Sequence, residues 1–224
     1  MVVSKVFIAC GGYYDNFNYP KALTEINGEK LVDRTIRLLK EYGIEPTVCC
    51  NLGETLFDSY NPTKCKFTYN HVQGTGYYLD LFDALPIFGQ CIILYGDVYY
   101  TEQAIDKIIL KYEKTDRNIF ICNALPFNEK RERWGEPFGW IVKDEEEFAY
   151  AVSLGKKFQD RGIVVNRRTG KLGGVPTNWE LAQIINGLDV NGFYFDEEDC
   201  LIISDKTIDV DDPSAIERVS ERVK

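Results

Sequence analysis

The chain has 224 residues, of which 45% are hydrophobic and 13% aromatic, and its formal net charge at pH 7 is −9. This composition is typical of a packed globular protein and excludes an intrinsically disordered chain. The acidic excess disfavours a nucleic-acid-binding protein, because such proteins usually present basic surfaces to phosphate. No apolar run approaches the roughly 20 residues that a membrane-spanning helix requires.

Seven cysteines occur mostly within apolar, strand-like runs, and no Cys-x-x-Cys pair is present. Buried free thiols in a reducing compartment are the simplest interpretation of this pattern. The N-terminal residues form an apolar, strand-like run with a single lysine and no cleavage signal, so we interpret them as a strand and not as a targeting peptide. We therefore expect a cytoplasmic protein without a membrane partner.

Strand-like and helix-like segments alternate through the first half of the chain, which predicts βαβ units and a mainly parallel sheet. The run 91–95 is wholly apolar, as is typical of a central strand. The helix that follows it has Thr101 in the N-cap position. Predicted strands are residues 2–10, 46–50, 64–69, 91–95 and 118–125, and predicted helices are residues 31–42, 77–85 and 101–112.

The pattern changes after Pro126, where charged and glycine-rich stretches separate shorter elements. We find no internal repeat and no low-complexity linker, so a single α/β domain is expected, with helices on both faces of a mostly parallel sheet and a small β extension. The elements predicted here are strands at 138–142, 192–195 and 201–204, a partly helical stretch at 143–162, a loop at 167–178, and helices at 179–185 and 213–223.

A glycine turn and a lysine follow the first predicted strand. Gly11 and Gly12 end the strand, and Lys21 comes after Pro20 nine positions later. Glycine lets a backbone approach a polyphosphate closely because it has no Cβ. Lysine supplies a compact cation that neutralises phosphate charge.

Two further motifs follow predicted strands, and ligands of open parallel sheets bind at the carboxyl ends of strands. Gly74-Thr75-Gly76 precedes the helix at 77–85 and could offer free N–H groups to an anion or a base edge, although a plain strand–helix connection is the alternative. Asp97 follows the apolar run 91–95, where a carboxylate suits a hard cation such as Mg²⁺. The alternative is a capping or strand-end aspartate.

Three carboxylates crowd the approach to the last predicted helix. Asp209, Asp211 and Asp212 lie within four residues just before Pro213. Such charges repel one another unless a cation or a helix N-terminus compensates them. Capping of the helix by Asp211 or Asp212 is the simpler alternative to a ligand site.

The order of these motifs resembles the nucleotidyltransferases with a GT-A-like fold, a superfamily that includes sugar-1-phosphate, phosphocholine and molybdenum-cofactor nucleotidyltransferases. The resemblance covers the whole chain. The matching residues in chain order are Gly11-Gly12, Pro20-Lys21-x-Leu23, Leu31-x-x-Arg34, Gly43-Ile44, Gly74-Thr75-Gly76, Gly96-Asp97 and Asp209-Val210-Asp211.

This resemblance implies a Rossmann-like GT-A fold in which residues 1–125 form a nucleotide-binding half and residues 126–224 an acceptor-binding half with a closing helix. It implies Mg²⁺ or Mn²⁺ held by Asp97 and Asp209, with Asp211 as the alternative second ligand. Catalysis would depend on Lys21, Asp97 and Asp209. The residues implied to hold the nucleotide are Cys10, Gly11, Gly12, Lys21, Gly74, Thr75 and Gly76.

The chain departs from the family in its phosphate loop, which normally carries a further glycine and an arginine. Asn16 stands near the arginine position, and no arginine precedes Arg34. Asparagine cannot replace the bidentate grip of arginine on a triphosphate without loss. Either Lys21, the backbone and a cation suffice, or a basic residue such as Arg131 or Arg133 compensates, or the protein no longer transfers nucleotides.

Four residues of the second half are candidates for binding the acceptor. Arg131 and Arg133 are basic residues that could bind a substrate phosphate. Trp134 and Trp140 flank Gly135-Glu136-Pro137 and form either an aromatic wall over a substrate or the core of a β extension.

The function implied is Mg²⁺-dependent nucleotidyl transfer from a nucleoside triphosphate to a phosphorylated small molecule, such as a sugar phosphate or a phosphocholine-like alcohol phosphate. The attacking phosphate is already ionised, so no general base is required. A GT-A glycosyltransferase is a second hypothesis, although Asp97-Val98-Tyr99 lacks the second acid of the usual Asp-x-Asp pair. A non-catalytic nucleotide or sugar-phosphate binder is the third, motivated by the missing arginine.

Overall fold

A computed structural model describes residues 3, 5–11, 17–67, 75–123, 135–166, 169–192 and 197–222. At the centre of the described part is a seven-stranded sheet with the order β12-β8-β9-β6-β1-β4-β5. All neighbouring strands are parallel except β9, which runs antiparallel to both β6 and β8. The strands are β1 (Val6–Ala9), β4 (Thr47–Asn51), β5 (Thr63–Cys65), β6 (Cys91–Tyr95), β8 (Ile119–Cys122), β9 (Pro137–Val142) and β12 (Cys200–Ile202).

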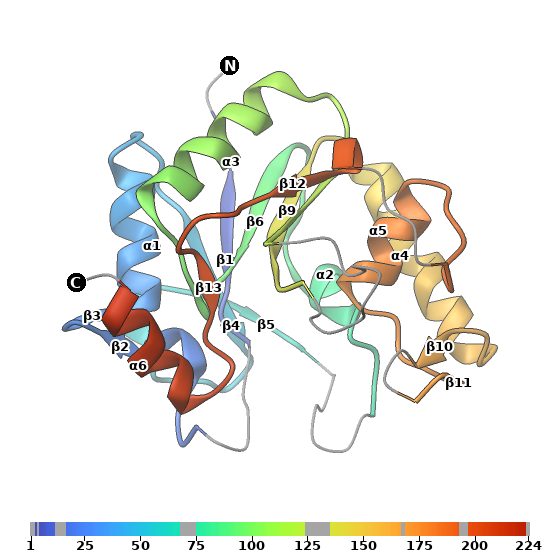
Figure 1. Cartoon of the computed structure of the whole chain (residues 1–224), viewed down its shortest axis with the longest axis horizontal. Coiled ribbons are helices and arrows are strands. Elements are labelled where there is room, and N and C mark those ends of the chain that lie inside the picture. Colours follow the sequence, from blue (N-terminus) through green and yellow to red (C-terminus); the bar gives the residue numbers. More distant parts are fainter. Residues whose placement is uncertain are drawn as a thin grey trace.

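Helices cover both sides of this sheet (Figure 1). On one side lie α1 (Leu31–Lys40) and α3 (Glu102–Lys114), and on the other lie α2 (Asp80–Ala84), α4 (Glu145–Asp160) and α5 (Asn178–Ile185). All five residues of β6 are buried between these layers, as expected for a central strand that is covered on both faces. The main hydrophobic core therefore encloses the strands whose carboxyl ends form the candidate site.

A second, smaller cluster lies beside α1. Here the hairpin β2 (Glu25–Ile26) and β3 (Glu29–Lys30) packs near α6 (Pro213–Arg222), and β7 (Val98–Tyr99) pairs antiparallel with β13 (Ile208–Asp209). The buried apolar side chains that join these pieces are Phe17, Ile26, Leu31, Tyr99, Val210, Ala215 and Val219. The cluster fixes the chain segments on either side of the acidic residues.

The predicted fold class is confirmed: the chain is an α/β protein with a mostly parallel central sheet. The strand at 91–95 has the predicted bounds, and Thr101 caps α3 by accepting a hydrogen bond of 3.0 Å from the Ala104 N–H. The predicted helix at 77–85 is shorter than expected, since α2 begins only at Asp80. Most of the predicted strand 192–195 lies outside the described residues, and Gly192 itself is not in a strand.

The predicted loop at 167–178 is partly wrong, because β11 (Lys171–Leu172) pairs there with β10 (Val165–Asn166). All seven cysteines are buried, and they form no disulfide bond with one another. None of the helices in the described residues is both long and apolar enough to cross a membrane.

Candidate active site

The carboxyl ends of β1 and β6 lie side by side and bring two glycine-containing turns together. Ala9 at the end of β1 is paired with Tyr95 at the end of β6, and the Gly96 N–H donates to the Ala9 carbonyl at 2.9 Å. Cys10 and Gly11 therefore lie next to Gly96 and Asp97. This is the edge of a parallel sheet at which ligands usually bind.

Gly96 is required here by close packing. A Cβ at this position would lie 2.5 Å from the Cys10 Sγ and 3.0 Å from the Ala22 Cβ. Cys10 is itself buried, and burial together with the charge of Asp97 raises the pKa of its thiol. Cys10 is thus a neutral packing residue beneath the turn that carries Asp97.

Lys21 lies at the centre of the acidic cluster. It begins the 3₁₀ turn Lys21–Leu23, and only 1% of its side chain is exposed. Its Nζ is 2.5 Å from the Asp97 Oδ2, 2.8 Å from the Asp211 Oδ1 and 3.8 Å from the Asp209 Oδ1. Burial alone would lower the pKa of Lys21, but the three carboxylates outweigh it and raise that pKa. The lysine is a permanent cation among carboxylates.

The ladder of β7 and β13 holds two of these carboxylates near one another. Asp209 is paired with Val98, the residue after Asp97, and the Val210 N–H donates to the Asp97 carbonyl at 3.0 Å. The backbone thus joins the turn after β6 to the segment before α6, which are far apart in the sequence. The proximity of Asp97 and Asp209, expected from the resemblance, is a feature of the structure.

Asp209 has an oxygen that the protein does not satisfy. Its Oδ1 is buried without a hydrogen-bond partner, and its side chain is 12% exposed. Burial, reinforced by the charge of Asp97, raises the pKa of Asp209 well above its ordinary range. A divalent cation, which prefers carboxylate oxygens, would satisfy such an atom, so Asp97 and Asp209 fit a metal. In the described residues, however, no three His, Cys, Asp or Glu side chains are gathered as a ready metal site.

Glu136 is a further acidic residue of the site that the sequence did not point to. Its Oε2 accepts hydrogen bonds from the Asp209 N–H at 3.2 Å and from the Asn123 Nδ2 at 3.1 Å. Because β9 runs antiparallel to its neighbours, its first residues lie at the carboxyl ends of β6 and β8. The position of Glu136 could not be predicted from the sequence, because no local pattern showed that β9 runs in the reverse direction.

The other predicted nucleotide-binding residues that the structure describes contact segments outside the acidic cluster. The Gly11 carbonyl accepts a hydrogen bond of 3.3 Å from the Asn51 Nδ2, and a Cβ on Gly11 would overlap the Phe67 ring. Thr75 is exposed, and the Gly76 carbonyl accepts a hydrogen bond of 2.9 Å from Gln159 of α4. The predicted residues outside the described part of the chain are Gly12, Gly74, Arg131, Arg133 and Trp134.

Trp140 does not form a wall over a substrate, and this prediction is corrected. Its side chain is 1% exposed on β9, an internal strand of the sheet. The indole packs against Phe82, Phe120 and Phe148, and its Nε1 donates to the Asn178 Oδ1 at 2.9 Å. The alternative interpretation, a core residue, is the one the structure supports.

Comparison with known proteins places this geometry in a family. No curated protein sequence matches the chain. Among solved structures, it resembles 2-C-methyl-D-erythritol 4-phosphate cytidylyltransferase from Thermus thermophilus, with a TM-score of 0.57, 11% identity and 98% of each chain covered. It also resembles a putative glucose-1-phosphate thymidylyltransferase from Bacillus anthracis, with a TM-score of 0.54, 11% identity, and 98% of this chain and 94% of that chain covered.

At this level of identity the structural likeness shows a shared fold. The sequence comparison shows the family as well. The MobA-like NTP transferase domain matches residues 6–156, which are more than half of the chain. The matched region contains β1, the Lys21 turn and the Asp97 turn. The protein therefore belongs to the family of MobA-like NTP transferase domains.

Proposed function

We propose that this protein transfers a nucleotidyl group from a nucleoside triphosphate to a phosphorylated small molecule and releases pyrophosphate. The observation that carries the proposal is the cluster of Lys21, Asp97 and Asp209 at the carboxyl ends of β1 and β6. The names of two structural neighbours describe cytidylyl and thymidylyl transfer and refer to phosphorylated small molecules. That class of acceptor is the one we propose for this chain.

A divalent cation, Mg²⁺ or Mn²⁺, would be held by Asp97 and Asp209. When bound, it would offset the negative charge of the reacting phosphates. The buried and unsatisfied Asp209 Oδ1 supports this assignment. Asp211 is more exposed, at 53% of its side chain, and is the alternative second ligand.

Lys21 has a double role in this proposal. Its Nζ occupies the space between the carboxylates, so a divalent cation and the lysine compete for the same oxygens. Lys21 would also neutralise the charge of the triphosphate of the nucleotide. The lysine would therefore keep the acidic cluster folded before the substrate arrives and bind phosphate afterwards.

The reaction itself needs alignment and charge neutralisation. An oxygen of the acceptor phosphate attacks the α-phosphorus, the bond from that phosphorus to the bridging oxygen breaks, and pyrophosphate leaves with the electron pair. Because the attacking oxygen is already ionised, no side chain has to remove a proton. Residues 1–125 would bind the nucleotide and residues 126–224 the acceptor.

Pyrophosphate release tests the proposal directly. The full-length protein is incubated with each of the four NTPs, Mg²⁺ and a panel of sugar 1-phosphates and alcohol phosphates. We expect pyrophosphate with at least one pair, and none with Asp97→Asn or in excess EDTA. Release of a nucleoside diphosphate from nucleotide sugars would instead identify a glycosyltransferase. Nucleotide binding without either product would identify a non-catalytic binder.

A further inference from the structure

Arg34 on α1 reaches the segment that directly follows the Asp97 turn. Its Nε donates a hydrogen bond of 2.8 Å to the Tyr100 carbonyl, and its Cζ lies 4.4 Å from the centroid of the Tyr99 ring. Only 15% of the Arg34 side chain is exposed. A guanidinium that stacks on an aromatic ring and donates a directed hydrogen bond holds both groups in one orientation.

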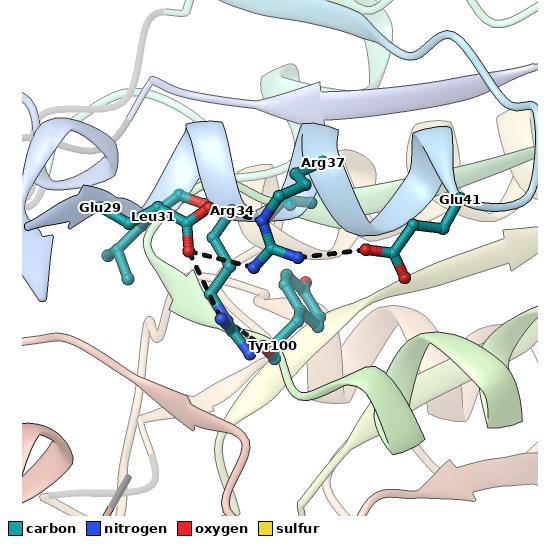
Figure 2. Close-up of polar contacts among 7 residues, drawn as sticks. Glu29, Leu31, Arg34, Arg37, Glu41 and Tyr100 are labelled. Carbon is teal, nitrogen blue, oxygen red and sulfur yellow. Dashed lines mark hydrogen bonds and ion pairs between the residues drawn. The ribbon is translucent and has the colours of Figure 1, made fainter. Parts of the chain in front are cut away.

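A small ion-pair network fixes the guanidinium of Arg34 in turn (Figure 2). Its Nη1 lies 3.4 Å from the Glu29 Oε2, and Arg37 binds the same carboxylate through two contacts of 2.8 and 3.1 Å. Arg37 also pairs with Glu41 at 3.1 Å. The Arg37 hydrogen bonds lower the pKa of Glu29, so this carboxylate is ionised and available to both arginines.

The segment that Arg34 holds is the strand that aligns the candidate metal ligands. Tyr99 belongs to β7, where it is paired with Ile208, while Val98 is paired with Asp209. This two-stranded ladder is separate from the seven-stranded sheet. The contacts that hold Tyr99 and Tyr100 against the rest of the protein therefore help to fix the position of this ladder.

Tyr100 is held from both ends. Its carbonyl is bound by Arg34, while its buried hydroxyl accepts a hydrogen bond of 3.1 Å from the Tyr95 N–H and donates to the Phe138 carbonyl. The hydroxyl thus connects the segment to β6 and β9, and Arg34 connects it to α1. Loss of either connection would free one side of the ladder.

From these contacts we infer that Arg34 is a positioning residue, which sets the relative placement of Asp97 and Asp209 by clamping β7 to α1. Its clamp acts on Tyr99 and Tyr100, which follow Asp97 by two and three residues. This inference rests on the proposed function only for its consequence in cation binding. The clamp itself is a property of the fold and has a separate readout.

Arg34→Met is the test variant, because it keeps an unbranched stem but removes the guanidinium. Arg37→Met is the matched control: Arg37 binds the same Glu29, is 44% exposed, and has Glu29 and Glu41 as its ion-pair partners. Three measurements are made on full-length protein: the Kd of Mn²⁺ by electron paramagnetic resonance, the hydrogen exchange rate of the Val210 amide, and kcat and KM for the nucleotide.

We expect Arg34→Met to weaken Mn²⁺ binding roughly tenfold, as is typical when a group that orients metal ligands is lost. The Val210 amide, which donates to the Asp97 carbonyl, should exchange at least about tenfold faster because the ladder opens more often. The value of kcat should fall more than KM rises, since misplaced ligands affect the transition state most. Arg37→Met should stay within about twofold of wild type in all three, as for other exposed ion pairs.

Wild-type Mn²⁺ affinity together with wild-type Val210 exchange in Arg34→Met would overturn the inference. Equal effects of Arg37→Met would overturn it as well, because the ion-pair network and not the clamp would then be responsible. If Arg34→Met does not fold, Arg34→Lys replaces it, since lysine keeps the charge but not the planar stacked donor, and the same criteria apply. A wild-type protein that binds neither Mn²⁺ nor nucleotide would overturn the proposed function, and Val210 exchange would still decide the role of Arg34.

Discussion

The ammonium of Lys21 lies 2.5 Å from the carboxylate of Asp97, in a position where one lysine faces three aspartates. Positive charge is therefore in deficit at this end of the sheet. Because Lys21 is buried, solvent and salt screen its interactions less than those of a surface pair. The pKa of Asp209 is raised mainly by burial and further by the charge of Asp97, and these effects outweigh the opposing effect of Lys21. The cluster is thus predisposed to accept a further cation.

Asp97→Asn should abolish turnover and leave the fold intact. The change removes the charge of one candidate metal ligand and adds almost no volume, and 20% of the Asp97 side chain is exposed. We expect kcat to fall by far more than tenfold, with an unchanged circular dichroism spectrum. A variant that retains more than about a tenth of the wild-type kcat, a barrier increase below roughly 1.4 kcal/mol, would rule out the metal assignment.

Lys21→Met should have opposite effects on nucleotide and metal. Removal of the buried ammonium leaves carboxylates without their cation, so the free energy of unfolding should fall by about 3 kcal/mol. Nucleotide binding should weaken, while Mn²⁺ without nucleotide should bind more tightly than in wild type, because its competitor is gone. Calorimetric titration and thermal melts measure both.

The control for this change is Lys40→Met, which removes an exposed lysine of α1 that pairs with Glu45. Its stability should stay within about 1 kcal/mol of wild type, as is usual for surface ion pairs. Unchanged or weaker Mn²⁺ binding by Lys21→Met would show that the lysine does not occupy the cation position.

Elements with a strong local signal could be predicted from the sequence. The strand β6 has the expected bounds because it is a wholly apolar run, and α3 begins where expected because Thr101 is a good N-cap. Both signals are local and do not depend on the partner elements. The order of the acidic and glycine motifs allowed the fold to be predicted as well, because that order resembles the one found in the nucleotidyltransferase superfamily.

The geometry of the site depended on contacts between distant segments. The strands β7 and β13 have two residues each, too few for a periodicity, so the alignment of Asp209 beside Asp97 could not be predicted from a pattern. The position of Glu136 follows from the reversed direction of β9. The same strand is covered on both faces, which makes Trp140 a core residue and not a substrate contact.

Asp209→Asn should raise stability in the absence of metal, and the gain should grow with pH. Since the pKa of Asp209 is raised in the folded protein, the folded state keeps a proton that the unfolded state releases near the ordinary aspartate pKa of about 3.9. Wild type therefore loses stability as pH rises from about 4 through the folded pKa, whereas asparagine does not titrate. Melting temperatures in EDTA at several values between about pH 5 and pH 8 measure the difference.

Asp205→Asn is a control for which the change in stability should have the opposite sign. Burial alone would raise the pKa of Asp205, but hydrogen bonds from Thr101 and Thr207 outweigh it and lower that pKa. Ionised Asp205 therefore stabilises the fold above the unfolded pKa, and this contribution is lost as pH falls through the folded pKa. The variant should be less stable than wild type near neutral pH. If Asp209→Asn also melts below wild type at every pH, the carboxylate is not strained by its surroundings.

Gly96→Ala tests the packing beneath the Asp97 turn. The added methyl group would lie 2.5 Å from the Cys10 Sγ, so either the thiol or the turn must move. We expect the free energy of unfolding to fall by about 1–3 kcal/mol, as is typical of overpacking, and turnover to fall because Asp97 is displaced.

In the double variant with Cys10→Ala the thiol is gone, and stability and turnover should both recover in part. A double-mutant cycle by urea unfolding gives the coupling, which should be about 0.5 kcal/mol or more for residues in contact. Strictly additive effects would mean that the remaining neighbours, the Ala22 side chain and the Ala9 carbonyl, and not Cys10, exclude a side chain at this position.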